Sequence, residues 1–163
     1  MAPSPSPRPV ASRVQAVAVY QGADQIGVRV LGPDGASQAL DSATLRRIFG
    51  GRAFTRDRRS RLGRLVQFHA QHDGAVVGIA AYTRQDDRLI VVELGLDRHL
   101  GDSMRLAILA RLLGAVEMAA LAGGARTVLL APAAVCGVTP LEHLGYRLRS
   151  LDLQAAWLEK ALP

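Results

Sequence analysis

The chain has 163 residues, the length of a single domain, and 49% of them are hydrophobic, enough to bury a full core. Its formal net charge is +6. Its lone cysteine, Cys136, cannot form an intramolecular disulfide or a cysteine metal cluster, so a reducing, cytoplasmic location is expected. No segment is predicted to span a membrane, because even the most apolar helix contains Arg105, Arg111 and Glu117.

The first 12 residues are predicted to form a disordered tail. Prolines alternate there with serine and alanine, a composition that cannot bury enough surface to become ordered. The apolar core of a signal peptide is missing from this segment. We expect residues 13–163 to form one domain.

The first part of this domain is predicted to contain two strands and a short helix. Alternating apolar residues indicate strands at 14–20 and 26–31. The helix is expected to begin after a cap at Asp41 or Ser42 and to end at the glycine pair 50–51.

Three antiparallel strands are expected next. Apolar runs at 62–71 and 75–83 flank the turn at 72–74, where an Asp-Gly pair tolerates the positive φ angles of a tight hairpin. A second turn at 85–87 leads into a β-branched strand at 89–96. Together these strands would form a meander.

The last strand of the meander is followed by a polar turn, a run of helix formers at 103–122 and a second apolar run at 127–131. This order predicts a strand, turn, helix and strand unit with a parallel crossover at the centre of the fold. A short helix is expected at 139–145. The segment 153–162 fits either a helix or a strand.

The helix at 103–122 has no continuous polar face. Its charged residues, Arg105, Arg111 and Glu117, follow one another at about 240° around the axis. Either its alanine-rich outer positions are exposed, or another element or a second subunit covers them. A homodimer is therefore one possible assembly.

The turn before this helix is a candidate anion site. A glycine there lets a ligand approach the backbone, and the first N–H groups of the helix point into the turn with the positive end of the helix dipole behind them. Alternatively, Gly101 makes only a tight turn and Asp102 caps the helix. Asp102 would also oppose an anionic ligand by its like charge.

The turn resembles the pyrophosphate loop of the GNAT acyl-CoA N-acyltransferases, [Q/R]-x-x-G-x-[G/A], at Arg98, Gly101 and, imperfectly, Ser103. Two further segments resemble this family: the turn into its sixth strand, at 144–147, and its closing strand, at 157–160. The resemblance implies an α/β fold with a mixed, mostly antiparallel, splayed sheet and flanking helices.

The resemblance also implies acetyl-CoA as co-substrate, bound where the fourth and fifth strands splay apart. The pantetheine arm would pair with the backbone of the fourth strand, and the pyrophosphate would lie on the N–H groups of the turn. The implied cofactor-binding residues are Leu94, Leu96, Arg98, His99, Leu100, Gly101, Asp102 and Ser103.

Transfer of an acetyl group to an amine needs a base for the ammonium and an acid for the leaving thiolate. Glu93 is the only acidic residue within the strand at 89–96, and the family often takes its base from that strand. The alternative is that Glu93 faces solvent or forms a salt bridge. The acceptor would be a small-molecule or peptide amine.

The acid that this family commonly uses, a tyrosine before the turn at 144–147, is replaced here by Leu141. Cys136, Thr139 and His143 are nearby in the sequence and could substitute, or water alone could protonate the thiolate. The main alternative to an enzyme is therefore a binding or regulatory module of the same fold that has lost turnover.

Arginines far outnumber acidic residues in one segment. Asp57 is the only acidic residue between positions 52 and 64, whereas the arginines there are Arg52, Arg56, Arg58, Arg59, Arg61 and Arg64. The segment could be a solvated loop or could recognise an anionic substrate or the adenosine phosphate of CoA. Nucleic acid is the least supported partner, because only Phe54 could stack on bases. With His69 and His72 lacking a third ligand, no metal site is expected.

Overall fold

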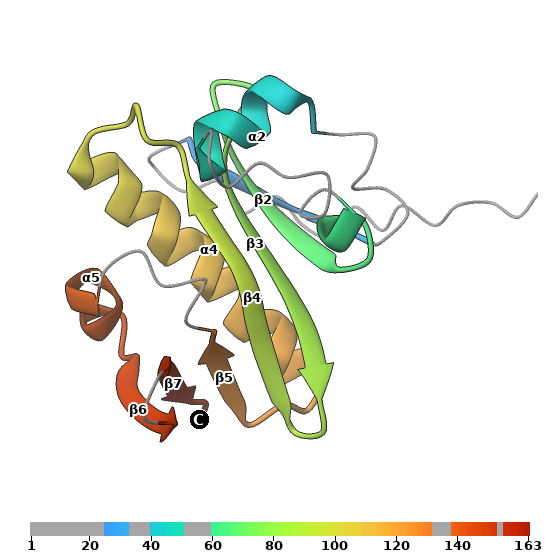
Figure 1. The fold of residues 1–163 in the computed structure, drawn as a ribbon, viewed down its shortest axis with the longest axis vertical. Helices are drawn as coiled ribbons and strands as arrows, with labels where there is room; N and C mark the ends of the chain where they lie inside the picture. The colour runs from blue at the N-terminus through green and yellow to red at the C-terminus, as the bar shows by residue number, and fades with distance from the viewer. Residues whose placement is uncertain (1–24, 33–39, 51–59, 132–137, 153–154) are drawn as a thin grey trace, which may run out of the picture.

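The computed structural model describes residues 25–32, 40–50, 60–131, 138–152 and 155–163. Within these ranges, one seven-stranded sheet has the order β1-β2-β3-β4-β5-β7-β6 (Figure 1). The strands are β1 Gly27–Leu31, β2 Val66–His72, β3 Ala75–Gln85, β4 Arg88–Leu96, β5 Thr127–Leu130, β6 Arg147–Asp152 and β7 Ala155–Ala161. The helices are α2 Ser42–Phe49, α4 Asp102–Ala122 and α5 Val138–His143.

The predicted meander is confirmed. Strands β1 to β4 pair antiparallel in sequence order, and β5 is parallel to β4 after the crossover through α4. Asp73 and Gly74 have φ angles of 50° and 77°, the positive values that the Asp-Gly turn was expected to supply. The sheet is mixed and mostly antiparallel, as the resemblance implied.

Two local predictions need correction, and one alternative that was left open is decided. β2 starts only at Val66, because residues 60–62 form a helical turn that leads into it. α4 begins one residue earlier than expected, with Gly101 as N-cap and Asp102 as its first residue, so Asp102 is not the cap. The last segment, which fitted either a helix or a strand, contains the strand that the resemblance implied, β7, which pairs with both β5 and β6.

Other predictions hold or fall outside the described residues. α2 begins after Asp41, whose carboxylate accepts a hydrogen bond of 2.7 Å from the Thr44 N–H, as expected of an N-cap. The proline-rich tail, the strand at 14–20 and most of the arginine segment lie outside the described residues. No helix in the described ranges is long and apolar enough to cross a membrane.

The two faces of the sheet are covered by different helices. A Cβ added at Gly78 of β3 would meet Ile108 of α4 at 2.8 Å, and one added at Gly95 of β4 would meet Ile48 of α2 at 2.6 Å. These glycines let α4 and α2 approach opposite faces closely. The main core lies between α4 and the sheet, and a smaller core lies under α2.

The pairing of β4 with its two neighbours changes near its middle. Ala81 of β3 pairs with Glu93, but Tyr82 pairs with Val91, so Val92 is an extra residue in β4 and forms a β-bulge. The parallel pairing with β5 ends at Val91 and Leu130, while β4 extends well past it (Figure 1). The C-terminal half of β4, after Val91, is therefore not paired with β5.

Candidate functional site

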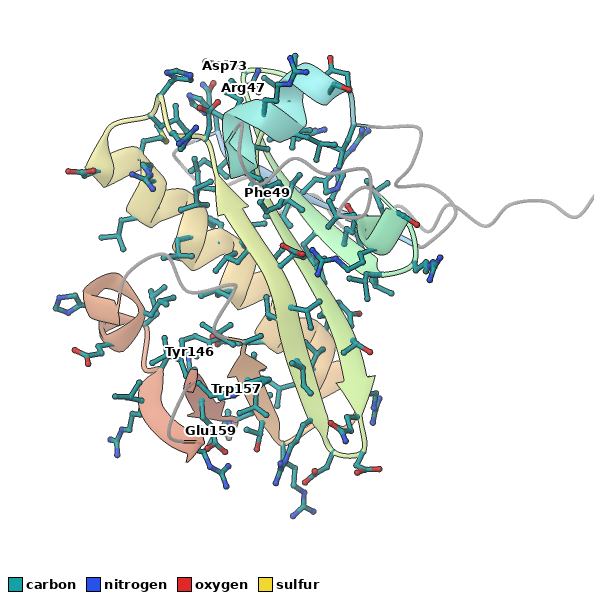
Figure 2. The ribbon with its side chains drawn as sticks, in the orientation of Figure 1. Arg47, Phe49, Asp73, Tyr146, Trp157 and Glu159 are labelled. Atoms are coloured by element: carbon teal, nitrogen blue, oxygen red, sulfur yellow. The ribbon has the colours of Figure 1, made fainter. Side chains whose placement is uncertain are left out.

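The turn between β4 and α4 is held by Asp97, a buried residue directly after β4. Its carboxylate accepts a hydrogen bond of 2.6 Å from Arg47 Nε of α2 and one of 2.9 Å from the His99 N–H. Arg47 also donates to the Val76 carbonyl at 2.8 Å (Figure 2). Asp97 and Arg47 thus fix the turn to the end of α2, a role that the sequence analysis missed.

The N–H groups of residues 100–104 have no hydrogen-bond acceptor among the described residues. The first backbone bond of α4 runs from the Arg105 N–H to the Gly101 carbonyl at 3.0 Å, which leaves the preceding amides at the mouth of the helix. A Cβ added at Gly101 would meet nothing within 4 Å. The mouth of α4 is therefore open and rich in donors.

The other residues predicted to bind the cofactor in this loop differ in whether they are free to contact a ligand. The His99 amide is already engaged by Asp97, so the available amides begin at Leu100. The Arg98 guanidinium packs against Gly50 at the end of α2, where an added Cβ would approach it to 2.7 Å. Asp102 and Ser103 are exposed in the first turn of α4.

Leu94 and Leu96 lie in the part of β4 that extends beyond β5. On the other side of β4, Leu94 pairs with Ala80 and Leu96 with Gly78 of β3. The Leu94 side chain belongs to the main core. The structure thus brings these two residues and the mouth of α4 to the same end of one strand.

Glu93 lies on the opposite face of β4, the one that α2 covers. Its side chain is 4% exposed, and Oε1 lies 3.0 Å from Nη2 of Arg61, whose side chain is 63% exposed. The alternative that Glu93 forms a salt bridge is therefore correct for this structure. Arg61 belongs to the helical turn before β2, at the end of the arginine segment.

Two further polar side chains are buried on this face. His69 Nε2 lies 2.8 Å from Gln67 Oε1, and Gln67 Nε2 donates to the Leu62 carbonyl. Because the Gln67 oxygen can only accept, Nε2 of His69 carries the proton. Burial, helped by the charge of Arg29, lowers the pKa of His69 to about 4, so the ring is neutral near pH 7.

The general acid is the least defined part of the site. Leu141 is a core residue, 2% exposed, and cannot donate a proton. Cys136 lies outside the described residues, Thr139 lies in α5, and His143 is exposed at the end of α5. The Tyr146 hydroxyl donates to Glu117 Oε1 at 3.0 Å, and burial together with Glu117 raises its pKa. The Tyr146 hydroxyl therefore has a structural role within the core.

No family model matches the sequence, and no curated protein matches it. Many solved structures nevertheless share its fold. An aminoglycoside 6'-acetyltransferase type Ii has a TM-score of 0.67 at 15% identity, covering 83% of this chain and 97% of that chain. The polyamine N-acetyltransferase of Drosophila melanogaster has a TM-score of 0.65 at 16% identity, covering 84% and 100%. The PaiA N-acetyltransferase of Thermoplasma acidophilum, in complex with coenzyme A, has a TM-score of 0.57 at 13% identity, covering 83% and 98%.

Proposed function

Because this chain has the fold of the GNAT acetyltransferases, we propose that it transfers an acetyl group from acetyl-CoA to an amine. Structural neighbours include enzymes named for aminoglycoside and polyamine acceptors, and one was solved with coenzyme A. A cytoplasmic location and a homodimer remain predictions from the sequence.

The observation that carries this proposal is the open set of amides at 100–104, beside the end of β4. Main-chain donors at a helix N-terminus favour a diphosphate, because the helix dipole adds to their positive charge. From there the pantetheine arm would reach the backbone of β4 near Leu94 and Leu96. This path would bring the thioester toward Glu93.

In the proposed reaction, the neutral amine attacks the acetyl carbonyl, an N–C bond forms, and the C–S bond breaks. Glu93 would accept the proton that the ammonium group loses, directly or through water. After the attack, the nitrogen would lose a second proton to water, and water would return one proton to the leaving thiolate, since Leu141 cannot supply one. The products are the N-acetylated amine and free CoA.

Calorimetric titration with acetyl-CoA tests the proposed cofactor site. We expect the wild-type chain to bind and Gly101→Ala to bind at least about tenfold more weakly, because a Cβ would enter the amide-lined space. Gly101 has a φ of −65°, so alanine fits its backbone and should cost less than about 1 kcal/mol of stability. Gly114→Ala, also in open space, is the matched control and should leave the affinity unchanged.

A wild-type chain that produces no heat with acetyl-CoA would overturn the cofactor proposal. If acetyl-CoA binds, a thiol-release assay over a panel of amines tests turnover. We expect Glu93→Gln to reduce turnover by about a hundredfold or more, the usual contribution of a general base. Unchanged turnover in this variant would exclude Glu93 as the base.

A binding or regulatory module without turnover is the second candidate, and Leu141 favours it because the common acid is missing. It predicts binding of acetyl-CoA with no thiol release for any amine. Anion or nucleic-acid binding through the segment 52–64 is a weaker candidate. It predicts an affinity for polyanions that falls steeply with salt concentration.

A further inference from the structure

We propose that Arg47 of α2 is a positioning residue for the cofactor: by holding Asp97, it fixes the direction of the open amides at 100–104 and so sets the affinity for acetyl-CoA. This inference rests on the proposed function. Arg47 belongs to the helix that packs on the face of the sheet opposite α4. It acts on the diphosphate through Asp97 and not by direct contact.

The first support is that the Asp97 carboxylate joins α2 to the turn with its two oxygens. Oδ2 accepts the hydrogen bond of 2.6 Å from Arg47 Nε, and Oδ1 accepts the one of 2.9 Å from the His99 N–H. The Asp97 N–H in turn donates to the Val77 carbonyl of β3 at 2.8 Å. Because Asp97 is held at both its backbone and its side chain, the position of Arg47 determines where the His99 amide lies.

The second support is that Arg47 is itself anchored. Its Nη2 donates to the Val76 carbonyl at 2.8 Å, and its own carbonyl accepts a hydrogen bond of 3.4 Å from the Arg98 N–H. A guanidinium presents its donors in a rigid, planar fork, so one group can bridge Asp97 and β3 at the same time. The turn is thus tied to α2 through both a side chain and the backbone.

The third support is that the mouth of α4 lacks a side-chain cap. Gly101, the N-cap residue, makes no side-chain capping hydrogen bond. His99 is the last residue before the open amides whose N–H is held by a side chain, among the residues that the structure describes. The direction of the amides at 100–104 therefore depends on how firmly Asp97 holds His99.

A fixed turn should bind a diphosphate more tightly than a mobile one, because a mobile backbone loses conformational entropy when the ligand orders it. Removing the Arg47 guanidinium would leave the buried Asp97 carboxylate without its cation, and such a carboxylate is costly to keep buried. It would turn toward water and weaken its hold on the His99 amide. The amides would then have to be ordered by the ligand itself.

Calorimetric titration of the full chain with acetyl-CoA tests the inference. We expect Arg47→Gln to bind about tenfold more weakly than the wild-type chain, because the turn is no longer fixed before binding. Arg46→Gln is the matched control. It removes the same charge from the same turn of α2, but Arg46 is exposed, so the affinity should stay that of the wild-type chain.

A double-variant comparison shows whether Arg47 acts through Asp97. Asp97→Asn alone should weaken binding to a similar extent, and Arg47→Gln combined with Asp97→Asn should bind about as weakly as either single variant, because both remove the same link. A guanidinium that attracted the diphosphate by its own charge would give losses that multiply. Urea unfolding checks that each variant is folded. Arg47→Lys, which keeps the charge but cannot bridge both partners, replaces Arg47→Gln in the comparison if that variant is unfolded.

Hydrogen exchange, followed by NMR without acetyl-CoA, provides the second readout. In Arg47→Gln, or in Arg47→Lys where that variant replaces it, the His99 N–H should exchange about tenfold faster than in the wild-type chain, because its acceptor is no longer held. The Asp97 N–H, which is bonded to β3, should exchange at the wild-type rate. A purely structural loss would speed the exchange of both amides.

The outcomes separate this inference from the proposed function. An Arg47→Gln variant with wild-type affinity, losses that multiply in the double variant, or equal acceleration of the two amides would overturn the positioning role. Binding of acetyl-CoA by the wild-type chain would still stand in each of these cases. If the wild-type chain produces no heat with acetyl-CoA, the proposed function fails and the positioning role fails with it.

Discussion

Two polar side chains, Asp97 and His69, are buried in the fold, and each is stabilised there by its neighbours. Asp97 orients the turn before α4 through Arg47 and the His99 amide. His69 is enclosed in the sheet beside Gln67 and stays neutral. Asp97 is buried together with the positively charged Arg47, whereas His69 is buried in its neutral form.

His69 should make the stability of the fold depend on pH. Its pKa is about 4 in the folded chain, against about 6.5 when unfolded. Between these values the unfolded chain binds a proton that the folded chain does not, so stability rises with pH in this window and is lost as the pH falls through it. We expect the free energy of unfolding to fall by about 2 kcal/mol between about pH 7.5 and about pH 5, measured by urea unfolding.

The matched variants for this prediction are His69→Gln and His143→Gln. Glutamine at position 69 cannot titrate, so the fall attributed to this site should disappear. His143 is exposed, and its substitution should preserve the wild-type fall. A pH dependence that is the same in His69→Gln and in the wild-type chain would show that other groups cause it.

The first turn of α4 combines features that favour and oppose an anion. Its open amides and the helix dipole attract negative charge, whereas the carboxylate of Asp102 repels it. The same carboxylate stabilises the helix, because it lies near the positive end of the dipole. Helix stability and anion binding should therefore respond oppositely to this residue.

The variant Asp102→Asn tests this opposition. We expect acetyl-CoA affinity to rise by about twofold to fivefold at low salt, and the free energy of unfolding to fall by about 0.3–1 kcal/mol. Calorimetric titration and urea unfolding measure the two effects. Asp73→Asn, in the hairpin turn between β2 and β3, is the control and should leave the affinity unchanged. A lower affinity in Asp102→Asn would mean that the diphosphate does not bind at this helix end.

On the scale of the whole molecule, α4 joins the meander to the C-terminal strands. Glu117 accepts a hydrogen bond of 3.0 Å from the hydroxyl of Tyr146, a residue labelled in Figure 2, and one of 2.8 Å from Lys160 Nζ. Lys160 also lies 5.6 Å from the centre of the Tyr146 ring. One carboxylate thus connects α4, the start of β6 and β7.

Removing the Glu117 carboxylate should lower the stability of the fold. We expect Glu117→Ala to lower the free energy of unfolding by about 2–3 kcal/mol, because a partly buried ammonium and a buried hydroxyl both lose their partner. Urea unfolding measures the loss. Glu142→Ala, on the exposed side of α5, should change stability by less than about 0.5 kcal/mol. Similar small effects in both variants would contradict a joining role for Glu117.

The far flank of α4 remains open in the described part of the chain. Met118 is 68% exposed, and a groove of about 700 Å³ lies between α4 and strands β1 to β3, lined by apolar side chains that include Phe68 and Tyr82. Of the two alternatives for the outer positions of α4, exposure to solvent is therefore the one that the described residues show. A second subunit that covers them is still a prediction, and sedimentation at micromolar concentration tests it.

Much of the fold could be read from short stretches of sequence. The Asp-Gly turn, the cap at Asp41 and the glycine-bounded helix at 103–122 depend on the conformations of neighbouring residues, and each was placed within a residue or two. The mouth of α4 was also located, because a strand followed by a glycine turn and a helix has a local signature. Contacts between residues far apart in the sequence could not be predicted in this way.

The sequence by itself determined the order of the elements, the meander, the parallel crossover and the position of the candidate turn, since local backbone preference and apolar periodicity fix these. Only the tertiary structure decided that the last segment forms a strand, that Arg47 meets Asp97 and that Arg61 covers Glu93. Those contacts join residues far apart in the chain. They exist because sheet register and helix packing bring distant side chains together, and no local pattern encodes that pairing.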